Sequence, residues 1–418
     1  MRLKNEIEKI SKEAKEASKV LAKSSTEIKN KALLSMSKEL KQKSSTIIRE
    51  NKKDLAHARK LKLSKAMIDR LTLDKERIKE MADSVKAVAS LEDPCGAIDK
   101  MWKRPNGLVI GKMRVAIGVI GIIYESRPNV TADCASLCIK SGNAVILKGG
   151  SESINSNIAI YKILRNCLKN QGLPKEAIGM VASTDRKSVS CLLKMDEYLD
   201  LIIPRGGEGL IRMVAKESRI PVIKHYKGVC HVYVDREADI KKALNICINA
   251  KVQRPGVCNA METLLVDKKI AKEFMPLVIG KLKAQGVEIR GCKATRALVK
   301  GIKLAKESDW YEEFLDLILA VRVVDGIDEA IAHIAEYGSN HSDTIVTEDF
   351  QRALKFLKEV DSSCVYSNAS TRFTDGFQFG FGAEIGISTD KIHARGPMAL
   401  EELTSYKYIV FGDGQIRK

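Results

Sequence analysis

Residues 2–92 repeat hydrophobic positions at the spacing of an amphipathic α-helix. The apolar residues that follow this spacing are Ile7, Ile10, Ala14, Ala17 and Leu21, and then Ile28, Ala32, Leu33, Met36 and Leu40. Acidic and basic residues alternate between them, which suits a solvated helix with ion pairs between neighbouring turns. The pattern therefore predicts helices throughout this region, and nothing in it indicates a functional site.

From about Lys103 the pattern shortens to that of β-strands. The segment 107–124 is rich in β-branched residues punctuated by glycine, which predicts consecutive strands. Strands and helices then alternate. The predicted strands are Ala144–Lys148, Ile178–Ala182, Leu199–Ile203 and Pro221–Ile223, and the predicted helices are Val130–Lys140, Ile154–Leu168, Lys187–Lys194 and Glu208–Glu217. Strands separated by helices of this length predict a parallel sheet with right-handed crossovers.

A second α/β run begins near Gly228. Its predicted strands are Cys230–Val234, Thr263–Val266, Val287–Arg290, Leu317–Val324, Thr344–Thr347 and Cys364–Ser367. A last apolar strand, Tyr406–Phe411, needs a partner edge, and we expect the early hairpin of its own or another subunit to supply it. The length of 418 residues also favours two or three domains over one.

Two glycine-containing turns follow predicted strands and precede predicted helices. One is Lys148-Gly149-Gly150-Ser151, and the other runs from Pro204 through Gly206 and Gly207 to Gly209. Ligands of parallel sheets bind beyond the carboxyl ends of the strands, and helix N-termini attract phosphate. Either turn alone could be an ordinary tight connection. Together, and with a lysine at a strand end, they favour a nucleotide site.

Cys258 lies in the stretch Gln253-Arg-Pro-Gly-Val-Cys-Asn259, between a predicted helix (Ile240–Lys251) and a predicted strand (Met261–Val266). Pro255 ends the helix and Gly256 permits a tight turn, so the thiol is held on a rigid junction. A nucleophile placed in this way needs little further ordering. The alternative is that Cys258 is one more small buried residue, as most cysteines are.

Asn129 lies where the strand segment ends and the helix Val130–Lys140 begins. Glu125-Ser-Arg-Pro-Asn129 interrupts the apolar pattern at this point. By itself the position favours an N-cap, whose side chain satisfies the first amides of the helix. A functional role for the amide remains the second interpretation.

Composition and charge limit the class of protein. A hydrophobic share of 44% is that of a globular chain, and no apolar run approaches the roughly 18 residues of a membrane span. The N-terminus has no apolar core of a signal peptide. Ten cysteines without any metal-like spacing predict a reduced, cytoplasmic protein with no metal site. The net charge of +18 lies in interleaved surface charges, so we expect anionic ligands rather than specific nucleic acid.

Several long motifs in this order resemble the aldehyde dehydrogenase superfamily. They are Gly121-Ile-Ile-Tyr-Glu-Ser-Arg-Pro-Asn-Val130, Lys140-Ser-Gly-Asn-Ala-Val-Ile-Leu-Lys-Gly-Gly-Ser-Glu152, Gln253-Arg-Pro-Gly-Val-Cys-Asn-Ala260, Gly382-Ala-Glu-Ile-Gly-Ile-Ser388 and His393-Ala-Arg-Gly-Pro397. The resemblance implies a three-part α/β fold. Residues 1–102 and 119–227 would form a Rossmann-like NADP-binding domain with N-terminal helices, 228–399 the catalytic cysteine domain, and 103–118 with 400–418 a small oligomerisation flap.

The resemblance also implies roles for single residues. Cys258 matches the catalytic nucleophile, and Asn129 matches the asparagine whose amide binds the oxyanion. Lys148 matches the lysine that reaches the adenosine side of the cofactor, and Glu313 resembles the glutamate that holds the nicotinamide ribose. The family's Phe-Gly-Pro after that glutamate is absent here.

Two departures from the family pattern point to a reductase that uses NADPH. Oxidising members carry a glutamate that activates water, whereas Pro221-Val-Ile-Lys-His225 offers a histidine and no carboxylate. His225 is therefore either a proton donor or a packed histidine. Ser151 stands where NAD-preferring members often have a glutamate, and losing that carboxylate removes a repulsion of the 2′-phosphate of NADP.

Within the superfamily the motifs are most similar to the branch that reduces an acyl phosphate in proline synthesis. This implies NADPH-dependent reduction of L-glutamyl 5-phosphate to L-glutamate 5-semialdehyde through a Cys258 thioester, in a cytoplasmic homo-oligomer supplied by a glutamate 5-kinase. Arg254 and Arg395 are candidate substrate residues, although Arg254 could equally form a structural ion pair. The alternatives are a related enzyme using a coenzyme A thioester, and a binding protein that keeps the fold without the chemistry.

Overall fold

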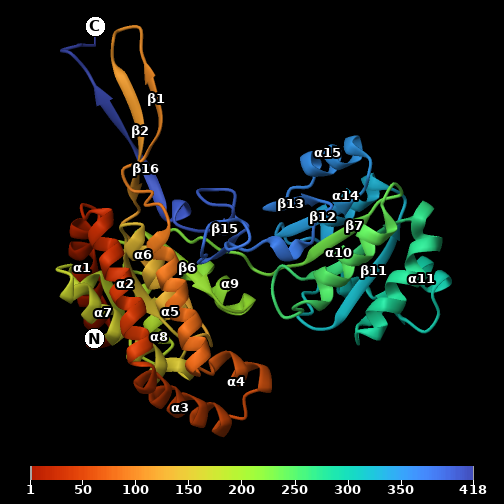
Figure 1. Ribbon diagram of the computed structural model, residues 1–418, viewed down its shortest axis with the longest axis horizontal. Helices are drawn as coiled ribbons and strands as arrows, with labels where there is room; N and C mark the ends of the chain where they lie inside the picture. The colour runs from red at the N-terminus through yellow and green to blue at the C-terminus, as the bar shows by residue number, and fades with distance from the viewer. Residues whose placement is uncertain (1, 418) are drawn as a thin grey trace. The chain divides into compact units, whose positions relative to one another are not determined.

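The computed structural model describes residues 2–417 and divides into two compact units (Figure 1). Unit 1 comprises Met1–Lys224, Gly380–Gly386 and Met398–Lys418, and unit 2 comprises His225–Phe379 and Ile387–Pro397. The first change of unit lies close to residue 227, where the sequence predicted the nucleotide domain to end. The division into two units leaves the predicted roles of the three parts as predictions.

Five helices open unit 1, as the hydrophobic spacing predicted. They are α1 (Arg2–Leu21), α2 (Thr26–Gln42), α3 (Ser44–Lys60), α4 (Lys65–Leu71) and α5 (Lys75–Ser90). Ile7, Ala14 and Leu21 of α1 are fully buried. Its polar face carries pairs such as Lys9–Glu13 and Lys19–Glu16, one helical turn apart. The interleaved charges of this region therefore belong to solvated helix surfaces.

A four-stranded parallel sheet of order β5-β4-β3-β6 forms the centre of unit 1. Its elements are β3 (Val119–Tyr124), α6 (Val130–Lys140), β4 (Ala144–Lys148), η1 (Ser151–Ser153), α7 (Ile154–Asn170), η2 (Lys175–Ala177), β5 (Ile178–Met180), α8 (Lys187–Leu192), β6 (Leu201–Arg205) and α9 (Glu208–Glu217). The predicted strand Pro221–Ile223 is wrong, because only Val222 forms an isolated bridge to Ile202. The strand order reverses between β3 and β6, which is where nucleotides bind on such sheets.

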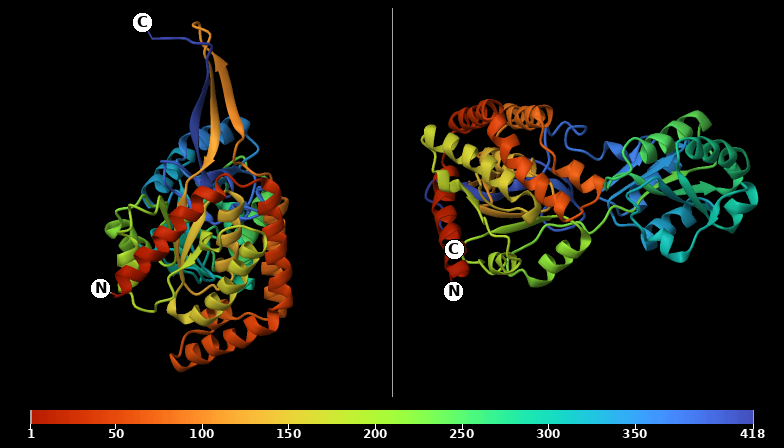
Figure 2. Two further views of the ribbon diagram at one scale, coloured as in Figure 1. Left: turned by 90° about the vertical axis from the view of Figure 1, so that its left-hand side faces the viewer. Right: turned by 90° about the horizontal axis from the view of Figure 1, so that it is seen from below.

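A separate three-stranded antiparallel sheet, of order β1-β2-β16, projects from unit 1 (Figures 1 and 2). It consists of β1 (Ile98–Lys103), β2 (Val109–Ala116) and β16 (Thr404–Phe411). The C-terminal strand pairs with β2 of its own chain along its whole length, so the partner edge expected from the sequence is in the same subunit. β1 starts before residue 103, where the flap was predicted to begin.

Unit 2 is built on a seven-stranded sheet of order β10-β9-β11-β8-β7-β12-β13, in which every described pairing is parallel. The elements are β7 (Cys230–Val234), α10 (Ile240–Val252), β8 (Met261–Asp267), α11 (Lys268–Ala284), β9 (Glu288–Gly291), α12 (Lys293–Leu298), β10 (Lys303–Leu304), α13 (Glu307–Trp310), β11 (Ile318–Val324), α14 (Ile327–Tyr337), β12 (Ser342–Val346), α15 (Phe350–Glu359), β13 (Cys364–Ser367) and η3 (Thr371–Phe373). The remaining short elements are β14 (Gly386–Ser388), β15 (Gly396–Met398) and η4 (Glu401–Leu403). The predicted alternation is confirmed for all six of the expected strands.

The central strands of this sheet are buried on both faces. All seven residues of β8 are buried, and the apolar residues of β8 pack with Phe274, Val278 and Leu282 of α11. A parallel sheet covered on both faces holds its strand ends rigidly. Among residues 2–417, no helix is long and apolar enough to cross a membrane.

Candidate active site

Cys258 lies on a turn between α10 and β8, as the sequence predicted. Its side chain is half-buried, in contrast to Cys134, Cys138 and Cys247, which are fully enclosed. The turn 253–260 leaves a helix that ends at Val252 and enters a fully buried strand. The interpretation of Cys258 as one more enclosed core cysteine is therefore wrong.

The backbone of Cys258 is fixed by close contact with the segment before β7. A side chain at Gly228 would place its first carbon 1.9 Å from the carbonyl oxygen of Cys258, so only glycine fits there. The thiol of Cys230 donates to the same oxygen at 3.2 Å. The peptide of the candidate nucleophile is thus held from one side by packing and by a hydrogen bond.

Glu313, predicted from the resemblance to bind ribose, contacts Gly228 through its side chain. Its Oε1 accepts a hydrogen bond from the Gly228 amide at 2.9 Å. The structure therefore brings Glu313 and Cys258 together through one intervening glycine. Whether the same carboxylate binds a ribose stays a prediction.

A buried ion pair that sequence reasoning missed anchors the Glu313 loop. Lys251 Nζ lies 2.5 Å from Glu262 Oε2, and neither side chain is exposed. Glu262 Oε1 accepts from the amide of Leu315, a residue in the left-handed region with φ of 52°. Burial raises the pKa of Glu262 and lowers the pKa of Lys251, so desolvation opposes both charges and their mutual attraction offsets it.

Arg372 is a second residue that the sequence did not single out. It belongs to η3, yet its Nε donates to Gln253 Oε1 at 2.9 Å, on the turn that carries Cys258. The sequence offered only a loop of suitable polar chemistry here. No local pattern announces a contact between residues 119 positions apart.

In unit 1, Asn129 stands at the N-cap position of α6 but does not cap it. Its backbone is helical and its side chain makes no capping hydrogen bond, so the capping interpretation is wrong. Instead Nδ2 donates to Asp133 Oδ2 at 3.0 Å, and Ser84 Oγ lies 3.1 Å from the other oxygen of Asp133. Burial raises the pKa of Asp133 to about 6, against the lowering effects of Asn129, Ser84 and Arg205.

The predicted cofactor residues of unit 1 gather at the carboxyl edge of its sheet. Lys148 is buried at the end of β4, and its Nζ donates to the Gly149 carbonyl at 2.8 Å. Ser151 is exposed at the start of η1. Gly206 and Gly207 lie exposed before α9.

Two carboxylates accept hydrogen bonds from backbone amides at this edge of the sheet. Glu125 Oε2 accepts from the amide of Gly207 at 2.8 Å. Glu152 Oε1 accepts both the amide and the hydroxyl of Ser126 at 2.7 Å. Both acids therefore have partners within unit 1, and neither pairs with Lys148.

Two further candidates have partners that bear on their roles. Arg395 forms an ion pair with Asp361 at 2.9 Å and also donates to the Asp361 carbonyl. The ring of His225 packs edge-on to His341, with 6.0 Å between centroids. The packed interpretation of His225 has this contact in its favour, and the contact does not test proton donation.

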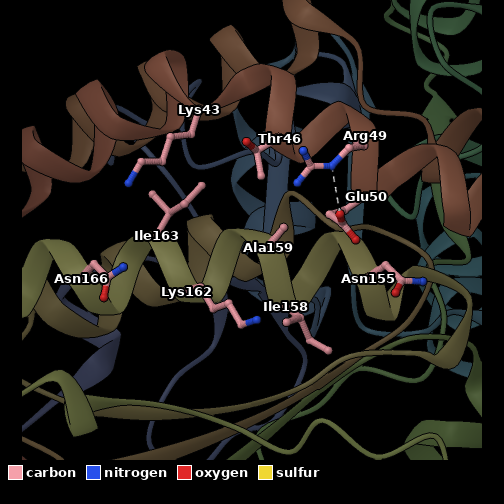
Figure 3. Close-up of a pocket in the computed structure, with 10 residues that line it drawn as sticks. All are labelled: Lys43, Thr46, Arg49, Glu50, Asn155, Ile158, Ala159, Lys162, Ile163 and Asn166. Atoms are coloured by element: carbon pink, nitrogen blue, oxygen red, sulfur yellow. Dashed lines mark hydrogen bonds and ion pairs between the residues drawn. The ribbon is translucent and has the colours of Figure 1, made fainter.

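A pocket of about 450 Å³ lies elsewhere, between α3 and α7 in the helical layer of unit 1 (Figure 3). Its lining residues are Lys43, Thr46, Arg49, Glu50, Asn155, Ile158, Ala159, Lys162, Ile163 and Asn166. None of the predicted site residues lines it, so it is separate from the candidate site.

Comparison with known proteins places the chain in one family. The model of the aldehyde dehydrogenase family matches residues 3–293. The γ-glutamyl phosphate reductase of Thermodesulfovibrio yellowstonii is 58% identical over 418 residues, covering all of both chains. The enzyme of the same name from Clostridium acetobutylicum is 55% identical, again over all of both chains.

Solved structures agree. The crystal structure of γ-glutamyl phosphate reductase from Thermotoga maritima has a TM-score of 0.97 and 47% identity, covering 99% of this chain and all of the other. An acetylating aldehyde dehydrogenase from Geobacillus thermoglucosidasius has a TM-score of 0.72 at 18% identity, covering 100% and 98%, which is a likeness of fold. The chain therefore belongs to the aldehyde dehydrogenase family of oxidoreductases, and over its whole length it is similar to members named γ-glutamyl phosphate reductase.

Proposed function

We propose that this chain catalyses the NADPH-dependent reduction of L-glutamyl 5-phosphate to L-glutamate 5-semialdehyde, with release of phosphate, in proline biosynthesis. The observation that carries the proposal is the similarity of the whole chain, at 55–58% identity, to curated relatives named γ-glutamyl phosphate reductase. The half-buried thiol of Cys258, on a turn fixed by Gly228 and Cys230, supports a covalent route.

In the first step the thiolate of Cys258 attacks the acyl carbon. A carbon–sulfur bond forms, and the bond from that carbon to the phosphate oxygen breaks, with its electron pair leaving on phosphate. We assign the oxyanion contact to the amide of Asn129, whose Nδ2 has a second N–H besides the one bound to Asp133. A donor of this kind typically lowers the activation free energy by about 3 kcal/mol.

The residues of unit 1 are compatible with a nicotinamide dinucleotide. The Lys148 ammonium binds a carbonyl and has no carboxylate partner within ion-pair distance in residues 2–417. A side chain at Gly207 would approach nothing closer than 4.0 Å, and one at Gly209, in the first turn of α9, nothing within 4 Å, whereas one at Gly206 would meet Glu125 at 2.4 Å. The space for a phosphate is therefore at Gly207 and the first turn of α9. We propose that Lys148, Ser151, Gly206 and Gly207 bind the cofactor, with Glu313 at the ribose. When bound, NADPH supplies the hydride that reduces the thioester.

Ser151 and Lys148 together favour NADPH. An exposed hydroxyl in place of a carboxylate does not repel a 2′-phosphate, and the ammonium of Lys148 can pair with one. Glu152 lies next to both residues: its Oε1 accepts from Ser126, and its Oε2 accepts from the Ser151 hydroxyl at 3.5 Å. We expect kcat/KM to be higher with NADPH than with NADH, and a clear preference for NADH would contradict this assignment.

The test of the reaction is an NADP⁺-reduction assay with glutamate 5-semialdehyde and inorganic phosphate. We expect phosphate-dependent formation of NADPH, and no activity when coenzyme A replaces phosphate. Activity with coenzyme A alone would replace the proposal by an acylating dehydrogenase. Iodoacetamide labelling that leaves Cys258 unmodified, together with salt-sensitive DNA binding, would favour a binding protein.

The projecting sheet supports the further proposal of a homo-oligomer. Tyr406, Tyr408, Val410 and Phe411 of β16 are all about half-exposed, which is unusual for apolar residues on a regular strand. A sheet edge of this kind is suited to pairing with another copy. Light scattering after size exclusion should give a mass that is a multiple of 46.3 kDa.

A glutamate 5-kinase as supplier and a cytoplasmic location stay predictions.

A further inference from the structure

We propose that Arg254 and Arg372 together form the subsite that binds the phosphoryl group of the substrate beside Cys258. The inference rests on the proposed function and adds to it the residues that recognise the leaving group. Arg254 lies on the cysteine turn itself, whereas Arg372 comes from η3, after the last strand of the sheet.

Hydrogen bonds fasten η3 to the cysteine turn on both sides of Cys258. Before it, Gln253 Oε1 accepts from Arg372 Nε at 2.9 Å. After it, the Asn259 carbonyl accepts from Thr371 Oγ1 at 2.8 Å, and the Asn259 side chain donates to the Thr374 carbonyl at 2.8 Å. The guanidinium of Arg372 is thereby fixed to the segment that carries the thiol.

The charges at this place are left unbalanced by the protein. Neither Arg254 nor Arg372 has a carboxylate within ion-pair distance among residues 2–417. Arg254 is exposed and Arg372 is half-buried. Two other half-buried arginines of unit 2 do have an acid partner, Arg290 with Asp309 and Arg352 with Asp235. Two guanidinium groups held together without an acid are a site for an external anion.

The electrostatic environment of Arg372 agrees with this geometry. Burial is the first cause that lowers its pKa, and the positive charge of Arg254 is the second. A Cys258 thiolate acts in the opposite direction, and Asp375 does so more weakly. Arg372 is therefore close enough to both residues to feel their charges, and a negative ligand would stabilise its charged form.

The chemistry of an acyl phosphate needs such a pair. Attack by the thiolate forms the carbon–sulfur bond and expels phosphate, which carries away the electron pair of the broken carbon–oxygen bond. Guanidinium groups bind phosphate oxygens with two parallel hydrogen bonds each and keep their charge at all relevant pH values.

The test compares Arg372→Gln and Arg254→Gln with wild type in the phosphate-dependent oxidation of glutamate 5-semialdehyde. We expect the KM for inorganic phosphate to rise at least tenfold in each variant, with a much smaller change in the KM for NADP⁺. Arg372→Lys should show an intermediate KM, since it keeps one charge and loses the paired hydrogen bonds. Arg296→Gln, an exposed arginine of α12 in the same unit, is the matched control and should behave as wild type.

A second measurement does not depend on turnover. Alkylation of Cys258 by iodoacetamide, followed by peptide mass spectrometry, should be slowed by inorganic phosphate in wild type and not by chloride at equal ionic strength. In Arg372→Gln the protection by phosphate should be lost. If the variants do not fold, the protection experiment on wild type decides alone, and absence of protection overturns the subsite.

The outcomes separate the two proposals. A wild-type enzyme without phosphate-dependent activity would refute the proposed function. Phosphate-dependent activity in wild type together with an unchanged KM for phosphate in both glutamine variants would refute the subsite and leave the function standing.

Discussion

The turns at the ends of the two parallel sheets differ in how the protein satisfies their charges. At the four-stranded sheet of unit 1, Glu125 binds the Gly207 amide and Glu152 binds Ser126. At the cysteine turn of unit 2, Arg254 and Arg372 share one region without a carboxylate, and the second is held there by a neutral amide.

The turns of unit 1 are therefore held in place by hydrogen bonds within the protein, whereas the cysteine turn of unit 2 carries two cations that we propose bind an anionic ligand. In unit 1 the local hydrogen bonds fix the backbone on which a dinucleotide can rest. In unit 2 neither Arg254 nor Arg372 has an acid within ion-pair distance among residues 2–417, and the proposed phosphoryl group would supply the missing negative charge. The predictions below test each half of the comparison, from the largest expected effect to the smallest.

The largest effect should come from Cys258→Ser. Without the sulfur no thioester forms, so kcat should fall by a factor on the order of 10⁴ or more, while NADPH binding stays near normal. Steady-state kinetics and a fluorescence titration with NADPH measure the two quantities. Cys191→Ser, another half-buried free cysteine, is the control and should keep wild-type activity. Retention of more than a few per cent of activity in Cys258→Ser would exclude the covalent route.

The junction around Cys258 was predictable from sequence because its causes are local. Pro255 and Gly256 come three and four residues after α10 ends at Val252, and the apolar run of β8 begins three residues after the cysteine, at Met261. The alternation of strands and helices was likewise predictable, since each element carries its own period. The roles of Cys258 and Glu313 were predicted only from the resemblance to the family and stay predictions, while the structure shows that both contact Gly228.

The rest of the site depends on contacts that no local pattern encodes. Arg372 reaches the cysteine turn through tertiary hydrogen bonds, and Glu262 reaches Leu315 across 53 residues. Strand β1 was missed for a different reason. Five of its six residues are exposed, so it has no apolar face whose period could announce it. The capping interpretation of Asn129 was wrong because its backbone is already helical, and the amides of Val130 and Thr131 donate to the carbonyls of Arg127 and Pro128.

The buried pair behind the cysteine turn should matter for stability. Lys251→Met leaves Glu262 without its cation in a site of zero exposure, which should cost about 3–5 kcal/mol of the free energy of unfolding. Lys251→Met combined with Glu262→Leu removes both charges and should recover most of the loss. Urea denaturation of both variants measures the effect. A full loss in the double variant would mean that packing, not charge, sets the cost.

The pair should also affect the reaction through Glu313, because Glu262 binds the amide of Leu315 in the same loop. The double variant, although stable, loses this acceptor. We therefore expect a raised KM for NADPH in a protein whose urea midpoint is near that of wild type. An unchanged KM would show that the Glu313 loop is held by other contacts.

Asn129→Ala tests the oxyanion donor that we assign to unit 1. Removing one oxyanion donor should lower kcat by about 10²–10³-fold, with little change in the KM for semialdehyde. Because Asn129 makes no capping hydrogen bond, the melting temperature should stay near that of wild type. Asp349→Ala, at an N-cap whose side chain accepts from two amides of α15, is the contrasting control: it should lower stability and leave kcat unchanged.

The smallest effect is a pH dependence that comes from Asp133. Burial raises its pKa to about 6 from an ordinary value of 3.8, so the folded chain keeps this proton where the unfolded chain has released it. The corresponding stability is complete below about pH 4 and is lost as the pH rises through 6, by an amount on the order of 1–2 kcal/mol. In Asp133→Asn this decline should vanish from urea unfolding curves recorded between pH 4 and pH 7.

The same carboxylate should tune the reaction rate through the orientation of Asn129. Above pH 6 the ionised Asp133 is the stronger acceptor for the Asn129 amide, with Arg205 the nearby cation that favours this state. We expect kcat of wild type to rise a few-fold between pH 5 and pH 7, and kcat of Asp133→Asn to lack that step because its side-chain oxygen accepts equally at both values. If inorganic phosphate binds at Arg254 and Arg372 alone, it should not shift this step. A phosphate-dependent midpoint would mean that the anion reaches the edge of unit 1 as well, and the distinction between the two turns would fail.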